Sequence, residues 1–145
     1  MARRSDTLRD EIARRGTVLA TVRGDSMSPH IDRGEVVRLA PAPRLRRGQV
    51  VAFEDEHGAL LVHRVIRIRG RSVFCRGDNR HDRDRPVDRA AVVAIAVAVR
   101  RPPDGPWRPL RRSVLPSLRL PLRRQVARVR WHLRRLAERL GRSRS

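Results

Sequence analysis

Short runs of aliphatic and β-branched residues alternate with turn-forming Gly, Pro, Asn and Asp residues over positions 1–100. Runs of this length and composition are typical of β-strands. Positions 56–58 and 69–71 are predicted to be hairpin turns, so the middle of the chain should form an antiparallel meander. We therefore predict a mainly β fold. The expected strands span residues 17–22, 35–40, 49–54, 59–68, 72–76 and 90–99.

A short helix is predicted before the first of these strands. Leu8 and Ile12 are four residues apart and would share one helix face. Asp6 is predicted to cap the helix, and Gly16 is placed to end it. The helix should act as a small lid or docking element on the β-rich domain.

The sequence changes in character after position 100. Prolines and a glycine at 101–109 disfavour both helix and central strand, which predicts a Pro-rich linker. Within 110–145, apolar residues recur in alternating steps of four and three with arginines on the other faces, which predicts a basic amphipathic helical tail. A domain over 1–100 should thus be followed by this linker and tail. The apolar positions of the tail are Leu122, Val126, Val129, Leu133, Leu136 and Leu140.

The chain is strongly basic, with a formal net charge of +20, and every basic residue is an arginine. From Arg100 onward, fifteen arginines face only Asp104 and Glu138, so +13 of this charge lies there. Such a charge attracts nucleic acid or an anionic membrane. Stacking aromatics are scarce, with Trp107 and Trp131 the only tryptophans, so no specific nucleic-acid partner is predicted. Residues 110–145 suit either docking on the domain or peripheral membrane contact.

Other classes of protein are disfavoured by the remaining composition. Cys75 is the single cysteine and cannot form an internal disulfide. The histidines lack metal-binding spacing, so no metal and no cofactor are predicted. The longest apolar run, 90–99, is half the length of a membrane-spanning helix, and the charged N-terminus does not look like a secretory signal. We therefore expect a cytoplasmic protein, with peripheral contact at the inner membrane face as the alternative.

The segment RGDSMSPH, residues 23–30, contains a candidate nucleophile in Ser26. A serine nucleophile needs an exposed hydroxyl, a nearby base and backbone N–H groups directed at the developing oxyanion. Gly24 permits close approach of a substrate backbone, and Pro29 fixes the turn that follows. An ordinary turn, in which Asp25 bonds its own backbone, explains the same residues.

The order of motifs over residues 22–99 resembles that of the signal peptidase I superfamily, the clan that also contains the LexA-type repressor proteases. The resemblance implies a β-rich catalytic domain over residues 1–100. It identifies Ser26 as the nucleophile, Met27 as a wall of the binding cleft and Pro29 as part of the turn that holds both. The matching segments are Ser26-Met27-Ser28-Pro29, Gly34-Glu35-Val36-Val37, Gly48-Gln49-Val50-Val51, His63-Arg64-Val65 and Gly77-Asp78-Asn79.

Most bacterial members of this superfamily use a lysine as the general base, and this chain has no lysine. His63 stands before Arg64-Val65, where those enzymes place their lysine. This matches the subgroup, typical of endoplasmic-reticulum and archaeal signal peptidases, in which histidine is the base. Imidazole titrates near neutrality, so the exchange is chemically reasonable. The alternative for His63 is a hydrogen-bonded strand histidine. The other histidines, His30, His57, His81 and His132, are expected to be solvated.

A histidine base works best with a carboxylate that fixes its tautomer. By its place after the Gly-Asp-Asn motif and before an arginine, Asp84 is the third member that the resemblance implies, and Asp82 is the alternative. Gly77, Asp78 and Asn79 are expected to brace the active-site turn, although a plain β-turn explains them nearly as well.

The chain departs from the superfamily in several ways. Many members have a serine or threonine two residues before the nucleophile, where this chain has Gly24, so backbone N–H groups would stabilise the oxyanion. Gln49 replaces the usual acid of the third motif. A transmembrane anchor is also not apparent in the sequence.

Taken with the resemblance, these residues predict a serine endopeptidase that cleaves a leader or signal-type segment from a peptide or protein precursor. Its substrate would lie extended along a strand edge. The alternative is a non-catalytic module that uses the same fold to bind nucleic acid or an anionic membrane surface. A self-cleaving LexA-type regulator is disfavoured because lysine is absent.

Overall fold

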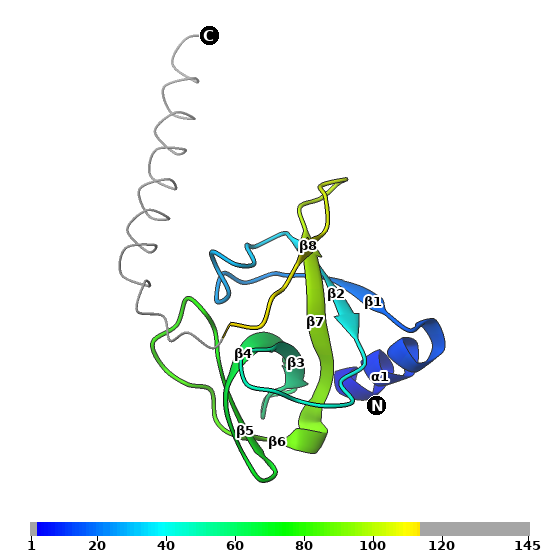
Figure 1. Cartoon of the computed structure of the whole chain (residues 1–145). Helices are drawn as coiled ribbons and strands as arrows, with labels where there is room; N and C mark the ends of the chain where they lie inside the picture. Colours follow the sequence, from blue (N-terminus) through cyan, green and yellow to red (C-terminus); the bar gives the residue numbers. More distant parts are fainter. Residues whose placement is uncertain (1–2, 114–145) are drawn as a thin grey trace. The chain divides into compact units, whose positions relative to one another are not determined.

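An eight-stranded sheet organises residues 3–113, the part of the chain that the computed structural model describes (Figure 1). Every strand pair in it is antiparallel, and the main path runs β1-β2-β7-β3-β4-β5-β6, with β8 paired to β7. The predicted mainly β fold is confirmed. The strands are β1 (Val18–Thr21), β2 (Val36–Ala40), β3 (Val50–Glu54), β4 (Leu60–Arg69), β5 (Ser72–Arg76), β6 (Val87–Asp88), β7 (Val92–Arg100) and β8 (Arg108–Pro109).

The predicted strands are all present, with ends within two residues of those expected. The largest shift is at β7, because Ala90 and Ala91 form the short 3-10 helix η1 (Arg89–Ala91) ahead of it. Asp88 caps that turn by accepting a hydrogen bond from the N–H of Ala90. The two-residue strands β6 and β8 were not predicted, because they are too short to produce a hydrophobic pattern.

The N-terminal helix α1 (Arg4–Arg15) is also present, but Asp6 does not cap it. The N-cap position is Arg3, and Asp6 lies in the first turn, where its charge still favours the helix dipole. The helix ends at Gly16, whose φ of 77° is one that glycine adopts readily. Ile12 is buried and packs α1 against the sheet.

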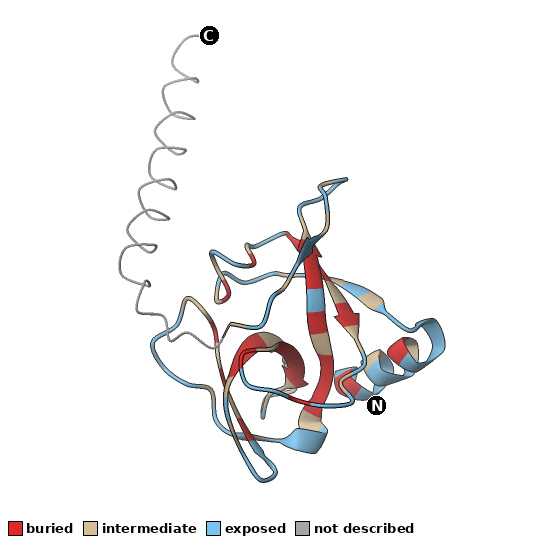
Figure 2. Ribbon diagram, in the orientation of Figure 1, coloured by how far each residue is buried: buried red, intermediate tan, exposed pale blue. Residues whose placement is uncertain are grey.

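Two hydrophobic clusters form the core, and β3 contributes to both of them. Val50 and Ala52 belong to the first cluster, whereas Val51 and Phe53 point to the second. Because successive residues of a strand face opposite sides, β3 is buried on both faces. Figure 2 shows the burial concentrated in the central strands, with exposed residues mainly in loops and turns.

The segment predicted as a linker, residues 101–109, ends in β8. There Arg108 and Pro109 pair with Val99 and Ala98 of β7. The helical tail predicted for 110–145 lies, from residue 114 on, outside the described residues. Over residues 3–113, none of the helical segments has the length and apolar character that a membrane crossing requires.

Candidate active site

Three side chains from separate parts of the chain meet beside the first half of β4. Ser26 comes from the loop after β1, His63 from β4 itself and Asp84 from the loop between β5 and β6. The Nε2 atom of His63 lies 2.9 Å from Ser26 Oγ, and its Nδ1 atom lies 2.6 Å from Asp84 Oδ2. Ser26 and His63 are 37 positions apart in the sequence. The fold therefore brings together the predicted nucleophile, base and carboxylate.

The surroundings of His63 fix the roles of its ring nitrogens. The side chain is only 4% exposed, and the ring of Phe53 on the neighbouring strand meets it edge-on with centroids 6.1 Å apart. An ionised carboxylate can only accept a hydrogen bond, so Nδ1 carries the proton that is shared with Asp84. The lone pair of Nε2 then faces the Ser26 hydroxyl and can accept its proton.

The carboxylate within hydrogen-bonding distance of His63 is that of Asp84 and not that of Asp82. Asp84 is held by its backbone N–H, which donates to the carbonyl of Cys75 at 3.0 Å. Asp82 is exposed. Burial raises the pKa of the Cys75 thiol to about 12, so this neighbouring residue stays protonated at neutral pH and is not a competing nucleophile.

The Gly77-Asp78-Asn79 segment braces the turn that carries Ser26. The backbone N–H of Asn79 donates to the carbonyl of Ser26 at 2.7 Å, and its side-chain amide donates to the carbonyl of Asp25 at 3.1 Å. A Cβ atom at Gly77 would lie only 2.6 Å from the carbonyl oxygen of Ser26. Only glycine therefore allows this close backbone approach.

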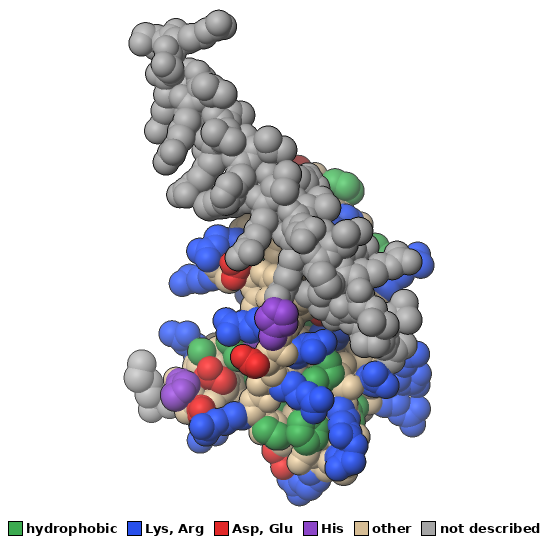
Figure 3. All heavy atoms as spheres, turned by 90° about the vertical axis from the view of Figure 1, so that its left-hand side faces the viewer, with side chains coloured by type: hydrophobic (Ala, Val, Ile, Leu, Met, Phe, Trp, Pro, Cys, Tyr) green, Lys and Arg blue, Asp and Glu red, His purple; other side chains and the backbone are tan. Residues whose placement is uncertain are grey.

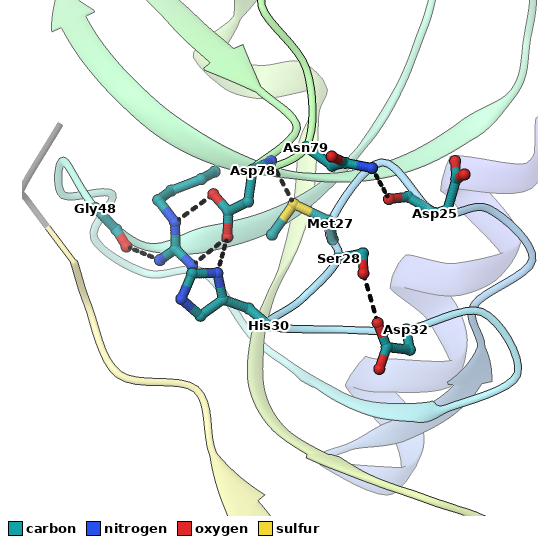
Figure 4. Close-up of polar contacts among 9 residues, drawn as sticks. Asp25, Met27, Ser28, His30, Asp32, Gly48, Asp78 and Asn79 are labelled. Carbon is teal, nitrogen blue, oxygen red and sulfur yellow. Dashed lines mark hydrogen bonds and ion pairs between the residues drawn. The ribbon is translucent and has the colours of Figure 1, made fainter. Parts of the chain in front are cut away.

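Met27 and the residues around it support the turn that carries Ser26 from the side of the hydrophobic core. Met27 is 1% exposed and belongs to the first hydrophobic cluster, and its sulfur receives the N–H of Asp78 at 3.4 Å (Figure 4). Its carbonyl accepts the N–H groups of His30 and Ile31, which closes the turn around Pro29. Met27 thus packs beneath the nucleophile. Gly24 and Asp25 are exposed, and a Cβ at Gly24 would meet nothing within 4 Å.

Comparison with known proteins agrees with this arrangement, since the profile of the Peptidase S24-like family matches residues 3–99. The chain belongs to this family. No curated protein matches the sequence significantly. The S24-like match covers α1, β1 to β6 and almost all of β7, and so includes every residue of the Ser26–His63–Asp84 arrangement.

A second polar cluster in the S24-like domain was not predicted. Arg64 donates to both oxygens of Asp78, at 2.8 and 2.7 Å, and its Nη1 donates to the carbonyl of Gly48 at 2.8 Å. The Nδ1 atom of His30 lies 2.8 Å from Asp78 Oδ2 (Figure 4). The expectation that His30 is simply solvated is therefore wrong. It is 43% exposed, but its ring is paired.

Within this cluster, Asp78 has a pKa that differs from its ordinary value. Burial alone would raise its pKa, but the hydrogen bonds and charges of Arg64 and His30 outweigh that cost, and the pKa of Asp78 is lowered. Asp78 is therefore an anion that an arginine already neutralises. The sequence signal for this buried pair was Arg64 itself, which lies between His63 and Val65 near the middle of a strand, because a buried guanidinium requires a partner.

None of the described residues forms a group of three or more His, Cys, Asp or Glu side chains that could hold a metal ion. The polar contacts of the site are instead hydrogen bonds among protein groups. The chemistry that the arrangement supports is nucleophilic attack by Ser26, with His63 in reach of its proton.

Proposed function

We propose that this S24-like chain is a serine endopeptidase in which Ser26 is the nucleophile, His63 the general base and Asp84 the carboxylate that orients it. The observation that carries the proposal is the continuous relay of 2.9 Å from Ser26 to His63 and 2.6 Å from His63 to Asp84. A buried imidazole aligned between a hydroxyl and a carboxylate is typical of a catalytic base and favours the peptidase over a binding module.

In the proposed mechanism, Ser26 Oγ attacks the carbonyl carbon of the scissile peptide bond while His63 Nε2 takes the hydroxyl proton. Asp84 stabilises the imidazolium that forms. His63 then gives this proton to the departing amine, which leaves an ester between Ser26 and the acyl part of the substrate. A water molecule, deprotonated by His63, hydrolyses the ester and restores the serine.

The backbone near Ser26 would have to stabilise the oxyanion, because Gly24 offers no hydroxyl. An extended peptide is the substrate form that fits β4. Within the described sheet, β5 pairs with β4 only from Arg64 onward, so the stretch 60–63 has a strand partner on the β3 side alone. A substrate peptide that pairs with residues 60–63 as an added strand would therefore end next to His63.

The substrate class is proposed to be a leader or signal-type segment of a peptide or protein precursor, cut after a small side chain. This part of the proposal rests on the resemblance to signal peptidases. Peripheral membrane contact through residues 110–145 would bring the enzyme to such precursors and is proposed on the same basis.

The alternative, a module that binds nucleic acid or an anionic membrane surface, has weaker support from the described residues. Arginine side chains are scattered over the face in Figure 3, with acidic side chains between them. Several exposed arginines are paired with acids, including Arg71 with Asp88 and Arg85 with Glu56. The described part of the face in Figure 3 thus mixes both signs of charge, whereas a uniform basic stripe is what favours nucleic acid.

Labelling with a serine-directed phosphonylating probe tests the proposal without a known substrate. The full chain and the variants Ser26→Ala, His63→Ala and Ser72→Ala would be compared, and the modified residue identified by peptide mass spectrometry. Ser72 is an exposed serine at the start of β5 and serves as the matched control. We expect labelling of Ser26 in the native chain and in Ser72→Ala, and none in Ser26→Ala. Labelling that persists in Ser26→Ala would refute the nucleophile assignment.

A further inference from the structure

Residues 107–113 contact the sheet repeatedly, although they lie beyond the family match that ends at residue 99. The ring of Trp107 lies 4.1 Å from the guanidinium carbon of Arg38 and 4.9 Å from that of Arg100. Leu110 packs against the first hydrophobic cluster, and its N–H donates to the carbonyl of Val97. We call residues 107–113 the C-terminal clasp.

The strongest polar contact of the clasp is made to Glu35, which is almost fully buried at 3% exposure. One carboxylate oxygen, Oε1, accepts a hydrogen bond from Arg108 Nη2 at 2.9 Å. The other, Oε2, accepts the backbone N–H of Asp32 at 2.9 Å. A buried carboxylate is costly unless both its charge and its hydrogen bonds are matched, so Arg108 is what allows Glu35 to hold the backbone at Asp32.

This contact continues to the turn that carries the nucleophile. The carboxylate of Asp32 accepts a hydrogen bond from the hydroxyl of Ser28 at 2.6 Å, two residues after Ser26 (Figure 4). Arg108 is thus linked, through Glu35 and Asp32, to the loop whose backbone must hold Ser26 in line with His63.

The clasp also reaches the opposite side of that loop. The N–H of Ser113 donates to the carbonyl of Gly48 at 3.1 Å, and the same carbonyl accepts Arg64 Nη1. Arg64 in turn holds Asp78, whose N–H contacts Met27. The approach requires glycine, because Gly48 has a φ of 88° and a Cβ there would lie 2.7 Å from the carbonyl oxygen of Ser113.

We propose that the C-terminal clasp positions the loop that carries Ser26, residues 22–35 between β1 and β2, which we call the nucleophile loop. Arg108 and Glu35 are then positioning residues for the reaction at Ser26. The inference rests on the proposed function and adds to it that the working catalytic unit extends to residue 113. If Arg108 is removed, Glu35 loses its hydrogen-bonded cation and keeps only the 4.0 Å contact with the largely exposed Arg101, so its hold on the Asp32 backbone weakens. Ser26 would then sample orientations in which its hydroxyl is out of line with His63.

The test measures the phosphonylation of Ser26 in the full chain and separates the maximal rate, kinact, from the half-saturating probe concentration, KI. Because a small misplacement of reacting groups lowers rate constants strongly, Arg108→Ala should lower kinact by about tenfold. Its KI should stay within about twofold of the native value, because the probe contacts are unchanged. Arg108→Lys, which keeps the charge, should recover most of the rate.

Arg101→Ala is the matched control, since Arg101 Nε is 4.0 Å from the same Glu35 oxygen and its side chain is 68% exposed. It should leave kinact unchanged. Ser28→Ala removes only the hydroxyl that ends the chain of contacts from Arg108 through Glu35 and Asp32. This variant should also lower kinact. All rates are taken at a temperature where thermal melting shows each variant to be folded.

A folded Arg108→Ala variant that reacts at the native kinact would overturn the inference, and so would a loss confined to KI. If Arg108→Ala does not fold, the Ser28→Ala variant tests the inference in its place. A native kinact in Ser28→Ala would then overturn the inference. These results differ from a failure of the proposed function, in which the native chain is not labelled at Ser26 at all and the inference fails with it.

Discussion

Two histidine–aspartate pairs lie close to Ser26 in the fold, one through His63 of β4 and one through His30 of the loop that carries Ser26, and their contact distances are nearly the same. Nδ1 of His63 is 2.6 Å from Asp84, and Nδ1 of His30 is 2.8 Å from Asp78. Their surroundings differ, since His63 is 4% exposed and His30 is 43% exposed. The Nε2 atom of His63 faces the hydroxyl of Ser26. The proposed catalytic role of His63 therefore rests on this contact and on its burial, and not on the imidazole–carboxylate contact, which both pairs share.

The carboxylates of the two pairs differ as much as the histidines do. Asp78 already receives two hydrogen bonds from Arg64, so its charge is neutralised whatever the state of His30. Asp84 has His63 as its side-chain partner and is available to stabilise an imidazolium. In the proposed function, the same residue types build a catalytic relay in one place and a structural brace in the other, and variants of each pair should separate the two roles.

The largest effect should come from His63→Ala. Without a base to take the proton, the serine hydroxyl is a weak nucleophile, and the rate of probe labelling at Ser26 should fall by about a hundred-thousandfold. Substantial labelling of folded His63→Ala would remove the distinction between the pairs.

The next largest effect is expected for Asp84→Asn. The asparagine amide can donate to Nδ1 and so favour the tautomer that carries its proton on Nε2, which cannot accept the proton of Ser26. The labelling rate should fall by about a thousandfold with little loss of stability. Asp82→Asn is the matched control, two residues away and exposed, and should keep the native rate. Equal losses in both variants would mean that the charge of the loop, and not the contact with His63, is responsible.

The residues of the Ser26–His63–Asp84 relay could be predicted from the sequence where they lie in recognisable local motifs. Ser26 and His63 lie in segments whose neighbours identify them, and the strands that precede Ser26 and contain His63 could be predicted from their apolar, β-branched residues. The choice between Asp84 and Asp82 depends on how an irregular loop folds back on Cys75, which no periodicity encodes. The pairing of His30 with Asp78 and that of Arg108 with Glu35 join positions far apart, so only the tertiary structure reveals them.

Asp78→Asn should affect stability more than chemistry. It leaves the guanidinium of Arg64, 10% exposed, without its carboxylate, so the free energy of unfolding at pH 7 should fall by about 3 kcal/mol. Because the pKa of Asp78 is lowered on folding, its stabilisation is fully present above about pH 4 and is lost as the pH falls through the native value. Urea unfolding from pH 7 to pH 2 should therefore show the native chain and the variant converging in acid. A constant difference over that range would contradict this account.

His30→Ala should have the smallest effect and is the sharpest comparison with His63→Ala. Arg64 keeps both of its hydrogen bonds to Asp78 in this variant, and the side chain that is removed, His30, is 43% exposed. The free energy of unfolding should change by less than about 1 kcal/mol, and Ser26 labelling should stay within about threefold of the native rate. Urea unfolding and probe kinetics on the same preparation measure both quantities. A labelling loss comparable to that of His63→Ala would mean that the second pair also acts on the reaction, through the turn that the carbonyl of Met27 closes with the N–H of His30.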